Sequence, residues 1–193
     1  MSVLVSPIGR IAYPHLFKAH AYEDGDKPKF SVILVYDPSI NLKAVKAACK
    51  KVAAEKYPNG VPPRFRWPFR KGSEKVDDDG NQREGFEADD VFLTFSRNAD
   101  FGPFDILDQH KNDAAPEDIY AGCLGRVVYN PYTYDYKGNK GVALGLEAFQ
   151  KTKDGDRIGR GRVNGESAFD DIEDDDEFED SELFDEADEE VPF

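Results

Sequence analysis

Apolar residues along the first 150 positions fall into short runs separated by turn residues, which is the pattern of β-strands. Residues 30–36 are rich in β-branched and aromatic side chains, and an Asp-Pro-Ser turn ends that run. The pattern predicts strands at 8–22 and 29–36, joined by a hairpin-type turn at 23–26. Later runs predict three more strands, at 91–96, 121–130 and 142–149, with 101–104 as a connection or a short strand.

A helical period interrupts the strands at residues 40–56. Ser39 or Asn41 is placed to cap the start of this helix, and the Pro-Asn-Gly sequence at 58–60 ends it. Residues 61–90 are irregular and predict a long insertion loop. The apolar side chains at helical spacing form one face of the predicted helix, and they are Leu42, Val45, Cys49, Val52 and Ala53.

The order of strands, one helix, a long insertion and more strands defines the expected fold class. It predicts a mainly β protein with an OB-fold-like antiparallel barrel, one flanking helix and a long insertion loop. A parallel α/β fold would alternate strands with helices instead. We expect residues 1–157 to form this domain, and residues 158–193 to form a flexible basic hinge and a disordered acidic tail.

Charge is divided sharply between these two parts. Residues 1–165 carry 25 Lys and Arg against 23 Asp and Glu, whereas the last 28 residues carry 16 acids and no Lys or Arg. The tail therefore accounts for the net charge of −14, and it has too little apolar surface to offset the entropy of ordering. A slightly basic body tethered to a polyanion suggests a groove that binds polyanions and a tail that imitates one.

Several function classes are disfavoured. No stretch approaches the ~20 apolar residues of a membrane span, and no signal peptide is visible, so we expect a cytoplasmic protein without membrane association. Cys49 and Cys123 are expected to be reduced and buried. The three histidines are too scattered for a metal site, and no cofactor motif is present. The acids at 77–79 could bind Mg²⁺ in a nuclease, but they are typical of an exposed turn, so we expect no enzyme activity.

The segment 64–71 alternates cations with aromatic rings and holds the only tryptophan. Single-stranded nucleic acid needs cations for its phosphates and flat apolar faces on which unstacked bases can lie. The segment supplies both within eight residues. The alternative is that the rings plug the core beneath a long loop. The residues predicted to bind DNA here are Arg64, Arg66, Trp67, Phe69, Arg70 and Lys71.

A second candidate lies at residues 129–140. In an extended chain, Tyr132, Tyr134 and Tyr136 share one side, and Lys137 and Lys140 flank the following turn. Aromatic rings beside a basic hairpin tip suit an oligonucleotide ligand, whereas the alternative places the rings in the core and the hydroxyls at its rim. A further basic stretch contains Lys151 and Lys153. It extends the DNA track, holds the tail when DNA is absent, or is a plain linker.

The chain ends in an apolar tip behind many acids, namely Asp188, Glu189, Glu190, Val191, Pro192 and Phe193. A partner protein with an apolar pocket and a basic rim could capture both the Phe193 ring and its carboxylate. Most acidic runs are only solvated, but a terminal Pro-Phe is not expected of a plain solubility tail. We therefore predict a partner-binding role for this tip.

These residues also carry a family resemblance. The tip is similar to the acidic Pro-Phe end of bacterial single-stranded-DNA-binding proteins. The body resembles a bacteriophage family that includes single-stranded-DNA-binding proteins. The resemblance spans most of residues 9–157, through the blocks at 9–14, 27–32, 119–126 and 138–155.

The resemblance implies an oligonucleotide-binding barrel that coats single-stranded DNA in phage replication and recombination, inside the host cytoplasm. It gives weight to Arg126, Tyr132, Tyr134 and Lys140 as binding residues. The tail would then compete with DNA and recruit a polymerase, helicase, primase or recombinase, and the chain could also form a homodimer. The rival hypothesis is a DNA-mimic protein, whose acidic tail inhibits a host nucleic-acid-binding enzyme.

Overall fold

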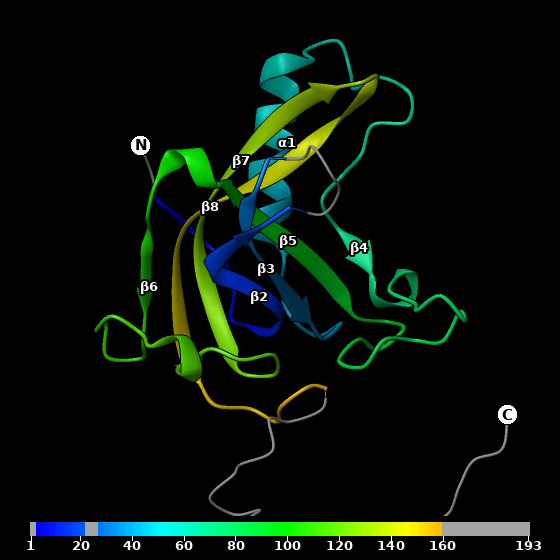
Figure 1. The fold of residues 1–193 in the computed structure, drawn as a ribbon. Helices are drawn as coiled ribbons and strands as arrows, with labels where there is room; N and C mark the ends of the chain where they lie inside the picture. The colour runs from blue at the N-terminus through cyan, green and yellow to red at the C-terminus, as the bar shows by residue number, and fades with distance from the viewer. Residues whose placement is uncertain (1–2, 22–26, 160–193) are drawn as a thin grey trace, which may run out of the picture. The chain divides into compact units, whose positions relative to one another are not determined.

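The computed structural model describes residues 3–21 and 27–159 (Figure 1). The predicted turn at 23–26 and the acidic tail therefore lie outside the described residues. One α-helix is present in the described part, α1 (Lys43–Lys56), and no described helix has the length and apolar character of a membrane span. The strands are β1 (Leu4–Val5), β2 (Gly9–His20), β3 (Lys29–Tyr36), β4 (Arg70–Lys71), β5 (Val91–Asn98), β6 (Asp105–Leu107), β7 (Leu124–Tyr136) and β8 (Asn139–Lys153).

Five of the strands close into a ring, in the order β7, β2, β3, β5, β8 and back to β7. All neighbours in the ring are antiparallel except β5 and β8, which pair in parallel at Phe95 with Leu144 and Ser96 with Gly145. An odd number of strands cannot alternate in direction all the way round, so one parallel pair is unavoidable. This ring confirms the mainly β, OB-like barrel with one helix.

The core fills the ring with alternate residues of each strand and with the apolar face of α1. Ile11, Leu34 and Phe95 are fully buried there. The predicted face of α1 is also buried, and the side chain of Asn41 accepts a hydrogen bond from the Lys43 amide at 2.9 Å. Burial raises the pKa of the Cys49 thiol to about 11, so this thiol remains protonated and inert at neutral pH.

The long insertion forms a second layer over the outer face of β2, β3 and β5. Phe86 is buried in a separate cluster with Ile33, Phe92 and two smaller residues of these strands. The guanidinium of Arg10 fixes the insertion, because it donates to Asp90 at 3.1 Å and to the carbonyl of Gly85 at 2.8 Å. The sequence predicts this segment as irregular, and it has only the short strand β4 and one 3-10 turn, Gly72–Glu74.

The strands predicted at 121–130 and 142–149 are longer in the structure and form one hairpin. Pairing runs from Leu124 with Lys153 to Tyr136 with Asn139. Beyond the ring, residues 131–136 and 139–143 extend as a two-stranded projection beside α1, which we call the arm (Figure 1). The strands β1, β4 and β6 are missing from the prediction, because two or three residues are too few to show a period.

The chain after β8 is fixed to the turn before β7. The hydroxyl of Tyr120 donates to Asp154 at 2.8 Å, and the amide of Ile158 donates to the carbonyl of Ala121 at 2.9 Å. Gly122 lies at the closest approach, where an added Cβ would overlap the carbonyl oxygen of Asp156. The described chain is thus attached to the barrel as far as residue 158.

Replacing Gly122 by Ala should destabilise the protein more than replacing Gly60 by Ala. Both glycines have φ of +108°, so both substitutions carry the backbone strain of about 1–2 kcal/mol. Only Gly122 has a backbone neighbour in the way of a Cβ, whereas Gly60 has nothing within 4 Å. Urea unfolding of the two variants measures the difference. Equal losses would show that the contact with Asp156 is not tight.

Candidate nucleic-acid interface

The fold brings the two predicted binding segments together. The amide of Arg66 donates to the carbonyl of Lys140 at 2.9 Å, and the amide of Val142 donates to the carbonyl of Arg66 at 2.9 Å. Further along, Arg70 pairs with Phe92 in β5. Residues 66–71 therefore run from the arm to β5, and they fill the space where β5 and β8 no longer pair with each other.

The aromatic rings of this segment have different environments. Phe65 and Phe69 are partly buried and pack against the main core. Trp67 keeps 37% of its surface exposed and meets Phe65 edge to face, with 5.0 Å between ring centroids. Trp67 is therefore the most accessible of the three rings, and the packing of Phe65 and Phe69 holds its backbone in place.

The tyrosines of the arm lie over unusually small neighbours. Tyr132 pairs with Ala143, and Tyr134 pairs with Gly141. The ring of Tyr132 also lies over Gly145, within 3.7 Å of the place where a Cβ would stand. Because the opposing strand offers no bulky side chain on this face, the rings can lie flat on it. Tyr132 and Tyr136 are 45% and 63% exposed.

The phenol of Tyr132 is neutral at physiological pH. Partial burial is the main cause that raises its pKa, with the neighbouring Tyr134 as a smaller one. A neutral ring carries no charge that would repel phosphate, so Tyr132 is suited to stacking against a base.

Cations surround the arm. Arg64 and Arg66 are exposed and form no ion pair within the described residues. Lys137 lies over the Tyr136 ring at 5.1 Å, and Lys140 pairs with Asp135 at 3.3 Å. At the other end of the segment, Arg70 pairs with Glu74 at 2.9 Å and Lys71 is exposed. Arg64, Arg66 and Lys137 are therefore the cations near the tyrosines that no described acid compensates.

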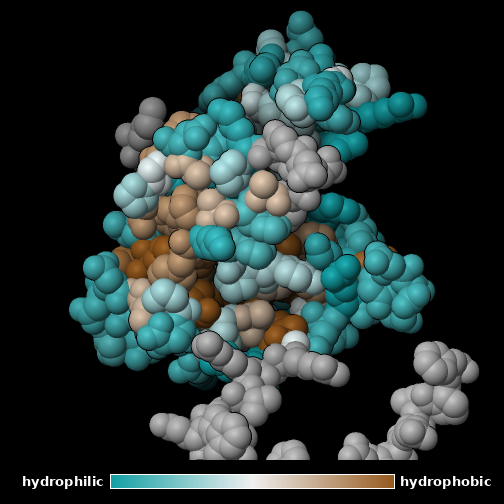
Figure 2. All heavy atoms as spheres, viewed as in Figure 1, coloured by the Kyte–Doolittle hydropathy of each residue, from teal (hydrophilic) through white to brown (hydrophobic). Residues whose placement is uncertain are grey.

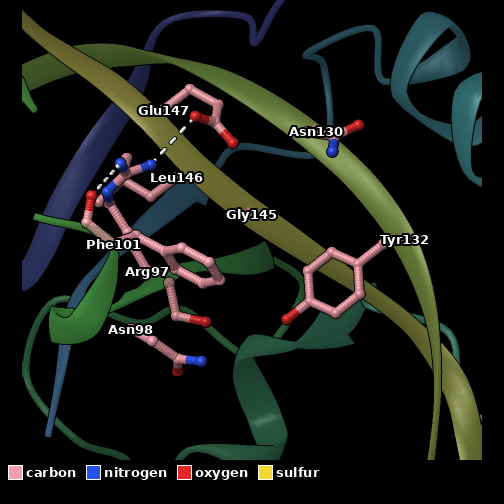
Figure 3. A pocket seen from close by; sticks show the side chains of 9 residues that line it. Arg97, Asn98, Phe101, Asn130, Tyr132, Gly145, Leu146 and Glu147 are labelled. Carbon is pink, nitrogen blue, oxygen red and sulfur yellow. Dashed lines mark hydrogen bonds and ion pairs between the residues drawn. The ribbon is translucent and has the colours of Figure 1, made fainter.

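Between the arm and the end of β5 lies a hollow of about 300 Å³ (Figure 3). Tyr132 enters it from β7, and Phe101 enters it from the 3-10 turn Ala99–Phe101 that follows β5. Phe101 is 69% exposed. Figure 3 shows the two rings on different sides of the hollow, with Asn98 below them. Two exposed rings around one hollow can hold a flat apolar ligand.

Arg97 holds the Phe101 side of this hollow. Its guanidinium donates to Glu147 at 3.1 Å, to the carbonyl of Phe101 at 3.0 Å and to the carbonyl of Gly102 at 3.3 Å. It also lies 5.7 Å from the centre of the Phe101 ring. Four contacts from one side chain fix the turn and its ring in position. Phe101 and Arg97 are not among the residues predicted to bind DNA, and their only signal in the sequence is an aromatic residue before a Gly-Pro pair.

The other predicted cations lie at the opposite end of the hairpin. Arg126 donates to Gln150 at 2.9 and 3.1 Å, and Lys153 is exposed at the start of the pairing. Lys151 pairs with Asp154 at 2.7 Å and donates to the carbonyl of Asp118. Tyr134 lies eight positions after Arg126 along β7, which corresponds to a distance of about 25 Å. The structure thus divides the predicted residues into an arm group and a distant group.

The acidic turn at 77–79 is stabilised by local backbone-to-carboxylate hydrogen bonds. The carboxylate of Asp77 accepts the amides of Asp79 at 3.0 Å and Asn81 at 2.8 Å. The bond from the Asn81 amide is the main cause that lowers the pKa of Asp77. Within the described ranges, no group of three or more His, Cys, Asp or Glu side chains is placed to hold a metal ion.

A five-stranded OB-like ring, with exposed rings around one hollow and exposed arginines next to the arm, defines a class, that of OB-fold proteins that bind nucleic acid. The sequence identifies the family to which the chain belongs. It belongs to the family described as the single-stranded-DNA-binding protein of Enterobacter phage Enc34, whose model matches residues 1–179. The family is one of binding proteins, in agreement with the expectation that the chain is not an enzyme. No curated protein sequence matches the chain significantly.

Solved structures share the fold. The Enc34 protein in complex with single-stranded DNA is 22% identical, with a TM-score of 0.62 over 80% of this chain and 88% of that one. A C-terminal truncation of it is 23% identical, with a TM-score of 0.59 over 79% and 86%. The gp2.5 single-stranded-DNA-binding protein of bacteriophage T7 is 15% identical, with a TM-score of 0.57 over 86% and 97%.

Replacing Gly141 by Ala should detach residues 64–67 from the arm. A Cβ at this position would overlap the carbonyl oxygen of Arg66 and come within 2.8 Å of the Tyr134 hydroxyl. The fluorescence of Trp67, the single tryptophan, should then shift to longer wavelength as its ring becomes more hydrated. Gly145→Ala is the matched control, because its closest contact would be 3.2 Å. An unchanged Gly141→Ala spectrum would contradict the attachment.

Proposed function

We propose that this protein binds single-stranded DNA with little sequence preference and coats it during phage replication and recombination. The observation that carries the proposal is the hollow, where the exposed rings of Tyr132 and Phe101 lie beside the arm. Membership of the Enc34 family and the shared fold support it. The Enc34 relative is described as bound to single-stranded DNA.

The geometry matches the chemistry of an unpaired strand. Tyr132, Phe101 and Trp67 provide flat faces for bases, and each such stack contributes about 1–3 kcal/mol with any base. Arg64 and Arg66 provide charge for phosphates, and binding therefore weakens as salt rises. Bases in a duplex are already stacked on each other, so the rings favour single strands over duplex.

The acidic tail has two roles in this proposal. As a tethered polyanion it competes with DNA for the cations of the barrel, with an effective concentration on the order of millimolar for a flexible tether. When DNA displaces it, the tip 188–193 becomes available to replication or recombination partners, such as a polymerase, helicase, primase or recombinase. Coating of the strand would then also recruit these partners.

Oligo-dT labelled with a fluorophore should bind more tightly than duplex DNA of equal length, as measured by anisotropy. Tyr132→Ala should lower the affinity about 5- to 150-fold, which corresponds to the loss of one stack of about 1–3 kcal/mol. Tyr132→Phe is the control and should keep the affinity, because the ring remains. Phe101→Ala should behave like Tyr132→Ala. Quenching of Trp67 during the titration would place the strand next to residues 64–67.

No binding of oligo-dT at modest ionic strength would contradict the proposal. It would leave the DNA-mimic hypothesis, in which the barrel is only a scaffold for the acidic tail. Equal losses for Tyr132→Ala and Tyr132→Phe would show that the hydroxyl, rather than the ring, is what the ligand contacts.

Deletion of residues 166–193 should tighten oligo-dT binding at low salt, because it removes 16 negative charges that compete with DNA. The difference between the full chain and the shortened chain should shrink as salt rises, since both the tail and the strand are held by charge. Salt titrations of the two proteins measure this. Weaker binding after the deletion would show that the tail assists DNA binding instead of competing with it.

A further inference from the structure

The positive charge of the body is concentrated in one continuous stretch. Residues 43–71 contain nine Lys and Arg and a single acid, Glu55, which is a net charge of +8. The rest of residues 1–165 contains 16 cations and 22 acids, a net charge of −6. The stretch comprises α1, the loop that follows and the segment that attaches to the arm. Most of the uncompensated positive charge of residues 1–165 therefore belongs to this stretch, and the remaining residues are net acidic.

Three of these cations form a stripe along α1. Lys43, Lys46 and Lys50 stand at helical spacings of three and four, so they lie on one face. All three are exposed, and none forms an ion pair within the described residues. Lys43 and Lys50 are about 10 Å apart along the helix axis. That length is comparable with one or two phosphate spacings of an extended strand.

The stripe is unfavourable for the helix itself. Like charges three or four residues apart destabilise a helix by about 0.2–0.5 kcal/mol per pair. The first turn of α1 holds no acid, although the positive end of the helix dipole favours acids there. Helix stability therefore does not explain why lysines occupy these positions, whereas a negatively charged ligand would.

The stripe and the arm flank the same segment. The ammonium of Lys46 lies 5.7 Å from the centre of the Phe69 ring. Tyr57, just after α1, meets Phe65 edge to face at 5.6 Å, and Phe65 meets Trp67 at 5.0 Å. In Figure 1, α1 lies beside the arm, and the same region of Figure 2 is strongly hydrophilic. A strand that leaves Trp67 can reach the stripe within a few nucleotides.

We propose that Lys43, Lys46 and Lys50 of α1 form a second phosphate-binding track, which holds the same single strand after it leaves the arm. The inference rests on the proposed function of single-stranded DNA binding. The rings at the hollow hold bases, whereas the stripe holds only phosphates. The occupied length of DNA is therefore greater than the hollow and the arm alone would cover.

The test compares a short and a long oligo-dT, of about 5 and about 16 nucleotides, within the range that one OB fold covers. The full-length double variant Lys43→Gln/Lys50→Gln should bind the short strand like the unmodified protein and the long strand more weakly. Its slope of log K against log salt for the long strand should be smaller by about 1.4, at about 0.7 per lost phosphate contact. Lys51→Gln/Lys56→Gln changes the charge of the same helix equally and should leave the slope unchanged.

A second variant separates binding from folding. Lys43→Glu places a carboxylate at the start of α1, where the helix dipole stabilises it, so thermal unfolding should occur at the same or a higher temperature. Long-strand affinity should nevertheless fall.

Equal slope changes in the stripe and control variants, or a loss confined to duplex DNA, would overturn the second track. Failure of the unmodified protein to bind either strand would instead contradict the proposed function.

Discussion

The pairing of β7 with β8 is the interaction on which the rest of the structure depends. Near Leu124 and Lys153 it closes the barrel, and near Tyr136 and Asn139 it forms the arm. The same thirteen-residue strand therefore buries Val127 and Tyr129 in the core and exposes Tyr132 to the hollow. Because one continuous hairpin carries both, the packing of the core sets the position of the arm and of Tyr132 at the hollow.

The segment 66–71 is the second constraint. It forms backbone hydrogen bonds to the arm and pairs with β5, while Phe65 and Phe69 pack against the core. Alternation of cations with rings thus has two consequences in one stretch. The buried rings anchor the chain, and the residues between them, Arg66 and Trp67, face outward. A segment that looks like a loose loop in the sequence is a structural bridge between the hairpin and the barrel.

Much of the barrel follows from local pattern. The helical period of α1, the long strands and the shared side of the three arm tyrosines could be predicted from the sequence. Each depends only on residues that are close together in the chain. The hollow could not be predicted in this way. It depends on Phe101, whose ring is positioned by Arg97 through Glu147, fifty residues further along the chain. The distance of Arg126 and Lys151 from the arm could not be predicted either. It depends on the register and length of β7 and β8, which decide where along the hairpin these residues lie. The assignments made to the tail remain predictions.

The parallel contact of β5 with β8 has a mechanical consequence. It joins the strands through two residue pairs, whereas β3 and β5 share eight. Backbone segments with few hydrogen bonds open most easily, so the weakest joints of the ring are this seam and the contact of β2 with β7, which also has two residue pairs. The seam includes Ser96 and Gly145, which also line the hollow. Opening at this seam would therefore change the shape of the hollow while the hairpin of β7 and β8 stays paired.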